Sequence, residues 1–211
     1  MSIKHCKIDI YPNPAATSGF LDLEQVIAEL ESGSNFELLL IEGLGDKTGF
    51  SPVIQLDVSL YGKWELLLER LRNLKIPSVA VVDGYCSGLS LEVVLSADVS
   101  VATENASFRM PEVGAGYLPG LSIFRLAKQV GLGNAKRFLL RGEVWSADQA
   151  RQYGLIDEFQ AQRDVHLSVA SLVEQMSPEH FNACRMGRRL LDESFGASYE
   201  DFLGRFLAAQ H

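Results

Sequence analysis

Residues 76–98 read IPSVAVVDGYCSGLSLEVVLSAD, which places a strand, a glycine turn and a helix in direct succession. The continuous β-branched run at 79–82 is typical of a strand buried on both faces. In the following helix, predicted at 89–96, the neighbours of Glu92 are apolar on both sides, so the helix is expected to be buried all round. A buried carboxylate without a partner is costly, and Glu92 is therefore a candidate functional residue.

Working outward from this stretch, strand and helix patterns alternate along the chain, which favours an α/β fold. Strands are predicted at 5–10, 36–41, 79–82, 99–102 and 107–110, and helices at 22–31, 60–74, 89–96 and 121–130. Asp22 is the expected N-cap of the first helix, and Ser146 begins a capping box with Gln149. The last fifty or so residues are predicted to be helical, with candidate helices at 181–191 and 199–208. We predict an αβ core, residues 1–158, followed by a helical C-terminal region, residues 159–211.

The composition is that of an ordinary soluble protein, with 211 residues, 47% hydrophobic and 22% charged. The net charge of −8 and the lack of a basic stripe argue against nucleic acid or an anionic membrane as partner. No apolar run approaches the ~20 residues of a membrane span, and the N-terminus does not resemble a secretory signal. The scattered cysteines Cys6, Cys86 and Cys184 fit a reducing cytoplasm, and no Cys/His cluster has metal-ligand spacing.

A second glutamate, Glu112, follows Pro111 and precedes the glycine-rich stretch at 114–120. Taken alone, Glu92 could be a helix-surface carboxylate and Glu112 a solvated loop residue. Two carboxylates that converge on one pocket, however, can carry out acid–base chemistry on carbon. A glycine turn that opens a helix can supply N–H donors to a developing oxyanion. The pair therefore suggests an enzyme.

A rival interpretation starts from Cys86, which takes the nucleophile's place in a nucleophile-elbow pattern between a strand and a helix. Asp148 or Asp157, followed by His166 or His180, would complete a triad in hydrolase order. The simpler alternative is that Cys86 is a small residue packed into a tight turn, which is common for free cysteine.

From Ile76 to Glu158 the chain resembles the enoyl-CoA hydratase/isomerase, or crotonase, family. No single short motif is decisive, but the series occurs in the family's order and spacing. The matching elements are Ile76-Pro77, Val79-Ala80, Gly84-Tyr85, Gly88, Glu92, Ala97-Asp98, Ala106, Phe108, Pro111-Glu112, Gly114, Pro119-Gly120, Arg125-Leu126, Gly131, Ala135, Gly142, Ser146-Ala147, Ala150, Gly154-Leu155 and Asp157.

The resemblance implies a crotonase-like α/β fold, in which ββα turns form a spiral of two roughly perpendicular sheets surrounded by helices. It also implies that C-terminal helices mediate trimerisation, and that trimers can pair into hexamers. We therefore expect a homotrimer or hexamer.

The same resemblance implies how a thioester would be held. Two backbone N–H groups would bind its carbonyl oxygen, one from Leu89 and the other from the loop near Ile54. Gly88 belongs to the same substrate-binding backbone, and Gly120 would aim the positive end of the following helix toward the carbonyl.

In the chemistry that this resemblance implies, Glu92 activates the water that adds at Cβ, and Glu112 delivers a proton to Cα. The expected activity is that of a lyase, either hydration of a 2-enoyl thioester or dehydration of a 3-hydroxyacyl thioester. The thioester would be carried by CoA or by an acyl-carrier protein, with no metal or redox cofactor. The alternatives are an isomerase that uses mainly Glu112, the Cys86-dependent hydrolase, and a non-catalytic partner subunit of a biosynthetic complex.

Overall fold

The computed structural model describes residues 3–7, 17–33, 35–50, 53 and 56–175, and the single positions 183, 186, 187, 190 and 191. The α-helices of this part of the chain are α1 Thr17–Glu31, α2 Val58–Arg72, α3 Gly88–Val94, α4 Ser122–Leu140, α5 Ala147–Gln152 and α6 Val165–Gln175, with short 3-10 turns η1 Val113–Ala115 and η2 Gln162–Asp164. The strands are β1 Ile3–Lys7, β2 Leu38–Glu42, β3 Ser78–Val82, β4 Tyr85–Cys86, β5 Val99–Thr103, β6 Ser107–Phe108, β7 Trp145–Ser146 and β8 Glu158–Gln160.

These strands form two sheets. The larger is a parallel, five-stranded sheet with the order β1-β2-β3-β5-β8, and the smaller is three-stranded with the order β4-β6-β7. Twice the chain contributes a strand to the large sheet, then a strand to the small sheet, then a helix, as β3-β4-α3 and β5-β6-α4. The α/β prediction is confirmed, and this repeat is the ββα turn that the resemblance implied.

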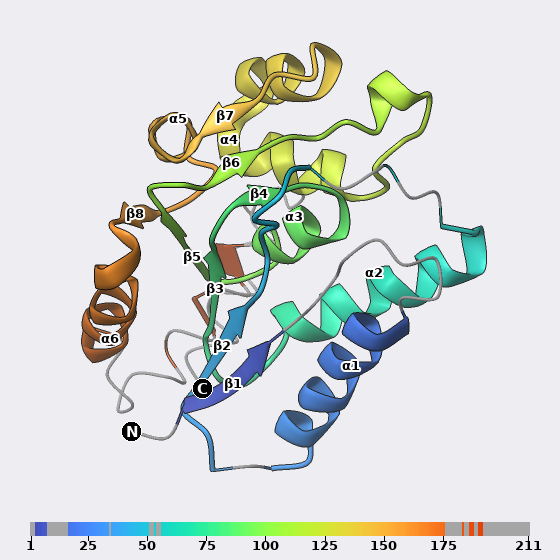
Figure 1. Cartoon of the computed structure of the whole chain (residues 1–211). Helices are drawn as coiled ribbons and strands as arrows, with labels where there is room; N and C mark the ends of the chain where they lie inside the picture. The colour runs from blue at the N-terminus through green and yellow to red at the C-terminus, as the bar shows by residue number, and fades with distance from the viewer. Residues whose placement is uncertain are drawn as a thin grey trace, which may run out of the picture.

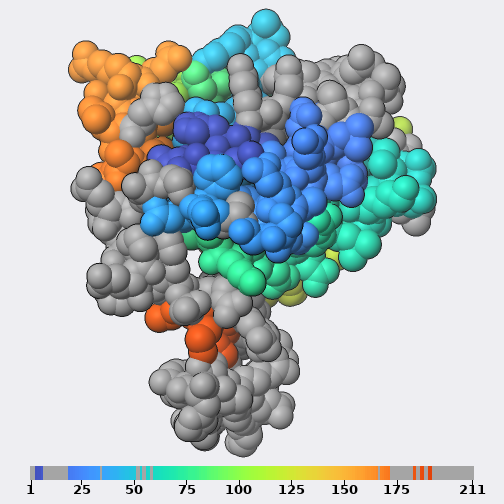
Figure 2. All heavy atoms as spheres, turned by 90° about the horizontal axis from the view of Figure 1, so that it is seen from below, coloured from blue at the N-terminus to red at the C-terminus, as the bar shows by residue number. Residues whose placement is uncertain are grey.

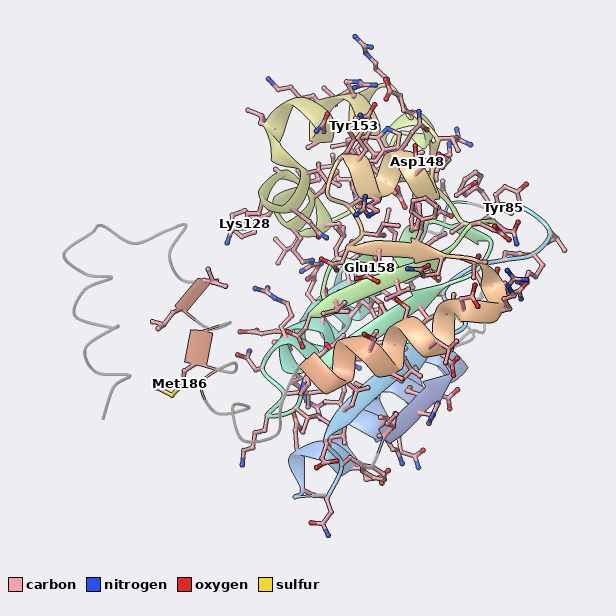
Figure 3. The ribbon with its side chains drawn as sticks, turned by 90° about the vertical axis from the view of Figure 1, so that its left-hand side faces the viewer. Tyr85, Lys128, Asp148, Tyr153, Glu158 and Met186 are labelled. Atoms are coloured by element: carbon pink, nitrogen blue, oxygen red, sulfur yellow. The ribbon has the colours of Figure 1, made fainter. Side chains whose placement is uncertain are left out.

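The central strands β2 and β3 are buried on both faces, as their continuous apolar sequences predicted, and helices lie on either side of the sheet (Figure 1). In β2, Leu38 and Leu40 point to the face covered by α6, where they join a cluster with Val165 and Val169. The alternate residue Leu39 points to the opposite face and the main core. Figure 3 shows α6 running across the near face of the sheet.

Helix α2 lies on that opposite side and contributes much of the main core. Asp57 caps it by accepting a hydrogen bond from the Leu60 N–H at 2.9 Å. The predicted apolar face is buried along most of its length, from Trp64 to Leu74. Phe20 of α1 packs against the Trp64 ring with centroids 5.8 Å apart, and α1 and α2 lie side by side in Figure 2.

Some predicted boundaries were wrong. Helix α1 begins at Thr17, not at the predicted cap Asp22, so Asp22 is an exposed residue inside the helix. The predicted end at Val130 coincides with Gly131, whose φ of 75° and ψ of 156° are not helical. A second helical segment then continues to Leu140, and the two segments together form α4. The Ser146 capping box with Gln149 is confirmed.

The C-terminal prediction falls largely outside the described residues, and the division at residue 158 stays a prediction. Described positions between 183 and 191 are helical, and Met186 lies outside the body formed by residues 3–175 (Figure 3). Within the described part of the chain, no helix is both long and apolar enough to cross a membrane.

The glycine turn after β3 is hydrogen-bonded to the loop after β2. Asp46 and Tyr85 exchange two backbone hydrogen bonds, of 2.9 and 2.7 Å. At Gly84, which has φ +103°, an added Cβ would overlap the carbonyl of Asp46. The turn that leads into α3 therefore requires a glycine for both conformation and space.

We expect Gly84→Ala to lower the free energy of unfolding by roughly 2–4 kcal/mol, since left-handed strain of ~1–2 kcal/mol is joined by a backbone clash. Urea unfolding measures the loss. Gly33→Ala is the matched control, because Gly33 has a similar φ of +101° but nothing within 4 Å of the added Cβ. Equal losses in the two variants would contradict the close approach.

Candidate active site

Glu92 is held on both carboxylate oxygens by side chains of α2. The Tyr61 hydroxyl donates to Oε1 at 2.9 Å, and the Trp64 indole N–H donates to Oε2 at 2.6 Å. Glu92 is 3% exposed and Trp64 1% exposed. The expectation that Glu92 is buried is therefore met, and its donors are residues that the sequence analysis did not select as functional.

Burial raises the pKa of Glu92 to about 7, while the hydrogen bonds from Tyr61 and Trp64 and the charge of Arg125 oppose the rise. The like charge that adds to it is Glu65, a neighbour on α2. The elevated pKa thus arises mainly from desolvation, and Glu92 titrates in the neutral range.

Glu112 lies at the start of η1, where its backbone carbonyl accepts from Ala115 and Tyr117 at 3.0 and 2.9 Å. Its side chain is 8% exposed, and its Oε2 atom is buried with no hydrogen-bond partner among the described residues. Burial raises its pKa, against smaller lowering effects of its own backbone N–H and of Arg109. A buried carboxyl oxygen without a hydrogen-bond partner is rare and is a candidate acceptor for a polar group from outside the chain.

Gly88 connects the two glutamates. A Cβ placed on Gly88 would lie 3.8 Å from Glu112 Oε1, so the Glu112 carboxyl sits beside the first residue of α3. Glu92 follows on the same short helix four residues later, a rise of about 6 Å. Helix α3 therefore carries Glu92 and has the Glu112 carboxyl beside its first residue.

Leu89, the next residue of α3, is half-buried and packs against the main core. Its N–H belongs to the first turn, where backbone N–H groups have no intrahelical acceptor. Ile54, the other expected donor, lies outside the described residues. The expected oxyanion pair therefore stays a prediction.

Gly120 lies two residues before α4, in contact with the Tyr61 side chain. With φ +54°, a Cβ at Gly120 would overlap the phenol ring of Tyr61. Beside this contact, Glu65 accepts from the Leu121 N–H at 3.2 Å and from Arg125 at 2.9 and 3.1 Å. Helix α2 thus joins Glu92 on α3 to the beginning of α4.

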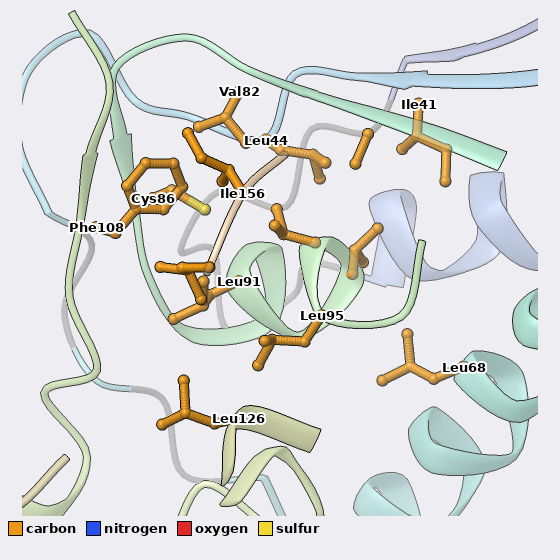
Figure 4. Close-up of a cluster of buried hydrophobic side chains, with 14 of the residues drawn as sticks. Ile41, Leu44, Leu68, Val82, Cys86, Leu91, Leu95, Phe108, Leu126 and Ile156 are labelled. Atoms are coloured by element: carbon orange, nitrogen blue, oxygen red, sulfur yellow. The ribbon is translucent and has the colours of Figure 1, made fainter. Parts of the chain in front are cut away.

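Cys86 is buried in the apolar interior. Its side chain lies with Val82, Leu91 and Phe108 in the cluster of Figure 4, and it is 0% exposed. Burial raises the pKa of its thiol well above the ordinary value, which disfavours the reactive thiolate. Cys86 is a packing residue, and we do not propose the thiol hydrolase.

The proposed triad partners give that hydrolase no support. Asp157 accepts from the Ser100 backbone N–H at 2.7 Å and from its hydroxyl at 3.1 Å, which fixes β5. The His166 side chain and all of His180 lie outside what the structure describes. Within the described residues, no group of three or more His, Cys, Asp or Glu could hold a metal ion.

The sequence is similar to a family model and to proteins named as hydratases of CoA thioesters. Residues 49–209 match the family model for enoyl-CoA hydratase/isomerase. An enoyl-CoA-hydratase of Amycolatopsis orientalis is 32% identical over 154 residues, covering 73% of this chain and 70% of that protein. A 2,3-dehydroadipyl-CoA hydratase of Escherichia coli strain K12 is 36% identical over 150 residues, covering 68% of this chain and 59% of that protein.

Solved structures share the fold. An enoyl-CoA hydrotase/isomerase family protein from Silicibacter pomeroyi superimposes with a TM-score of 0.84 at 18% identity, covering 99% of this chain and 93% of the other. An enoyl-CoA hydratase from Bacillus anthracis gives a TM-score of 0.78 at 18% identity, covering 91% and 78%. These matches confirm the predicted crotonase-like fold.

The burial of Glu92 predicts how stability varies with pH. Its pKa of about 7 in the folded chain exceeds the ordinary 4.5, so the folded state holds more protons between these values. The stability contributed by protonated Glu92 is complete below about pH 4.5 and is lost as the pH rises through about 7. Relative to Glu92→Gln, we expect the wild type to lose about 3 kcal/mol over this window, measured by urea unfolding. A difference between the two proteins that does not change with pH would contradict the buried, titrating acid.

Proposed function

The chain belongs to the enoyl-CoA hydratase/isomerase family, and from this membership we propose that it adds water to a 2-enoyl thioester or removes water from a 3-hydroxyacyl thioester. The observation that supports the proposal is that two buried glutamates with raised pKa values lie at α3, Glu92 on the helix itself and Glu112 beside its first residue. The aligned region covers 59–70% of the two relatives described above. The acyl group and its carrier, CoA or a carrier protein, therefore belong to the proposal.

In the proposed mechanism, Glu92 acts as the base and Glu112 as the acid of the hydration. With a pKa of about 7, Glu92 is ionised in a large part of the population at neutral pH and can accept a proton from water. Burial favours the protonated form of Glu112, which then gives its proton to Cα. Dehydration uses the same groups in the opposite protonation states.

The negative charge that develops on the thioester oxygen needs donors. We propose the backbone N–H of Leu89 and that of Ile54 for this role, with Gly88 allowing the close approach of the thioester. One such donor typically contributes a factor of ~10²–10³ in rate. Gly120 leads into α4, whose N-terminal dipole would add favourable charge. We assign no metal or redox cofactor, because two carboxyls and backbone N–H groups suffice for this chemistry.

The test follows hydration of crotonyl-CoA, longer 2-enoyl-CoAs and carrier-linked enoyl thioesters by the loss of conjugated thioester absorbance. We expect Glu92→Gln and Glu112→Gln each to lower kcat by about 10²–10⁴-fold, the usual contribution of a positioned acid or base. Activity unchanged in both variants would contradict the mechanism. No turnover of any thioester by the wild type would favour the non-catalytic partner subunit.

A second candidate is the isomerase, favoured by one difference between the two acids. Both oxygens of Glu92 already accept hydrogen bonds, whereas Glu112 Oε2 has no partner among the described residues. A single free carboxyl can move a proton between two carbons of a 3-enoyl thioester. Conversion of 3-enoyl-CoA to 2-enoyl-CoA that survives Glu92→Gln but not Glu112→Gln would select this activity.

We also propose a homotrimer or hexamer assembled through the C-terminal region. In the sequence, Ala183, Met186, Gly187, Leu190 and Leu191 recur at i, i+3, i+4, i+7 and i+8, the spacing of one helix face, and the structure gives these positions as helical. Met186 lies outside the main body (Figure 3), where a second chain can reach it. Sedimentation equilibrium should give the mass of a trimer or hexamer, and Met186→Asp with Leu190→Asp should reduce that mass. A monomeric wild type would contradict the assembly.

A further inference from the structure

The two donors that hold Glu92 differ in what they can do with a proton. The Trp64 indole N–H can only donate, whereas the Tyr61 hydroxyl can both donate and accept. A proton on Glu92 Oε2 would face the Trp64 N–H and break the 2.6 Å bond. A proton on Oε1 can instead be donated to the Tyr61 oxygen, once its hydroxyl turns round, so the 2.9 Å contact survives. Protonation of Glu92 is therefore directed to Oε1.

Tyr61 is also more exposed to solvent than Glu92 or Trp64. Glu92 and Trp64 are 3% and 1% exposed, while Tyr61 is only half-buried. The phenol end of Tyr61 packs directly on Gly120 at the start of α4. Of the two groups that bind Glu92, the Tyr61 hydroxyl is thus the one that extends toward the proposed thioester site.

We propose that Tyr61 is a positioning residue: its hydroxyl orients the Glu92 carboxyl and transfers a proton to it. Trp64 only holds the other carboxyl oxygen in place. The proposal rests on the hydration proposed above. As water adds to Cβ, one of its protons passes to the Tyr61 oxygen, and the Tyr61 hydroxyl proton passes to Glu92 Oε1. The C–O bond forms, the carbon–carbon double bond is lost, and Glu112 gives its proton to Cα. Glu92 ends neutral, Glu112 ends as a carboxylate, and Tyr61 is unchanged.

Burial and the charges around Tyr61 favour the neutral form of its hydroxyl. Burial raises its pKa most, followed by the Glu92 charge and hydrogen bond and the Glu65 charge, while Arg125 lowers it. Arg125 is paired with Glu65 at 2.9 Å, so it does not supply an unopposed positive charge. The proton is therefore exchanged through a neutral phenol and not through a phenolate.

The experiment compares Tyr61→Phe, Trp64→Phe and Tyr153→Phe in the full chain with crotonyl-CoA, or with whichever enoyl thioester the wild type turns over. Tyr61→Phe keeps the ring that packs on Gly120 and should lower kcat about 100-fold, with KM changed less than about threefold. Trp64→Phe removes a donor to the ionised carboxylate, so it should move the acidic limb of the kcat/KM pH profile upward. Tyr153→Phe is the matched control, since half-buried Tyr153 packs on Trp145, 4.8 Å between ring centroids, away from Glu92, and should match the wild type.

A proton inventory separates a relay from simple loss of packing. With the water proton, the Tyr61 proton and the Glu112 proton all moving as water adds, the wild-type rate should vary as a curve with the fraction of deuterium oxide. Tyr61→Phe should remove one of these protons and reduce the curvature. A Tyr61→Phe enzyme with wild-type kcat, beside inactive Glu92→Gln and Glu112→Gln variants, would overturn the relay and leave the hydration intact.

An inert wild type would overturn the hydration, and the contact with Tyr61 is then tested without activity. The Glu92 side-chain carboxyl is titrated by carbon-13 NMR, with Glu92→Gln identifying its signal. A Glu92 pKa raised by Tyr61→Phe supports Tyr61 as the group that positions it. Identical titration curves in the wild type and in Tyr61→Phe would overturn that role as well.

Discussion

A carboxyl group buried in the interior must find hydrogen-bond donors, and in this fold Glu92 finds them on α2. The bonds from Tyr61 and Trp64 connect α3, which carries the acid, to the helix that covers the same face of the large sheet. Glu65, one position further along α2, connects that helix to the start of α4 through Arg125. The hydrogen bonds of two carboxylates, Glu92 and Glu65, thus join three helices around the candidate site.

The large sheet and its covering were predictable from sequence because both rest on local patterns. The β-branched run of β3 and the apolar face of α2 reflect burial directly, and so both were predicted with small errors of boundary. Glu92 was predicted as functional because a carboxylate among apolar neighbours stands out, and Glu112 because it pairs with Glu92 as a second acid before a glycine-rich stretch. Their surroundings were not found, since the contact between Tyr61 and Glu92 spans thirty-one positions and leaves no local pattern.

One signal for that contact was nevertheless present. Trp64 lay on the predicted buried face, and a buried indole N–H needs an acceptor, just as buried Glu92 needs donors. Matching the indole donor of Trp64 with the carboxylate acceptor of Glu92 would have predicted their contact. The origin of the raised pKa could not be predicted in this way. Burial is its main cause, and the like charge that contributes comes from Glu65 on α2.

Helix α6 lies beyond residue 158, the predicted end of the core, yet it packs on the large sheet. It supplies Val165 and Val169 to the cluster that covers Leu38, Leu40 and neighbouring strand residues on the second face of the large sheet. A chain cut at residue 158 would leave that face as a continuous apolar surface in water. Such a fragment would self-associate before it could act as an independent folding unit. Attempts to produce a minimal catalytic fragment should therefore retain α6.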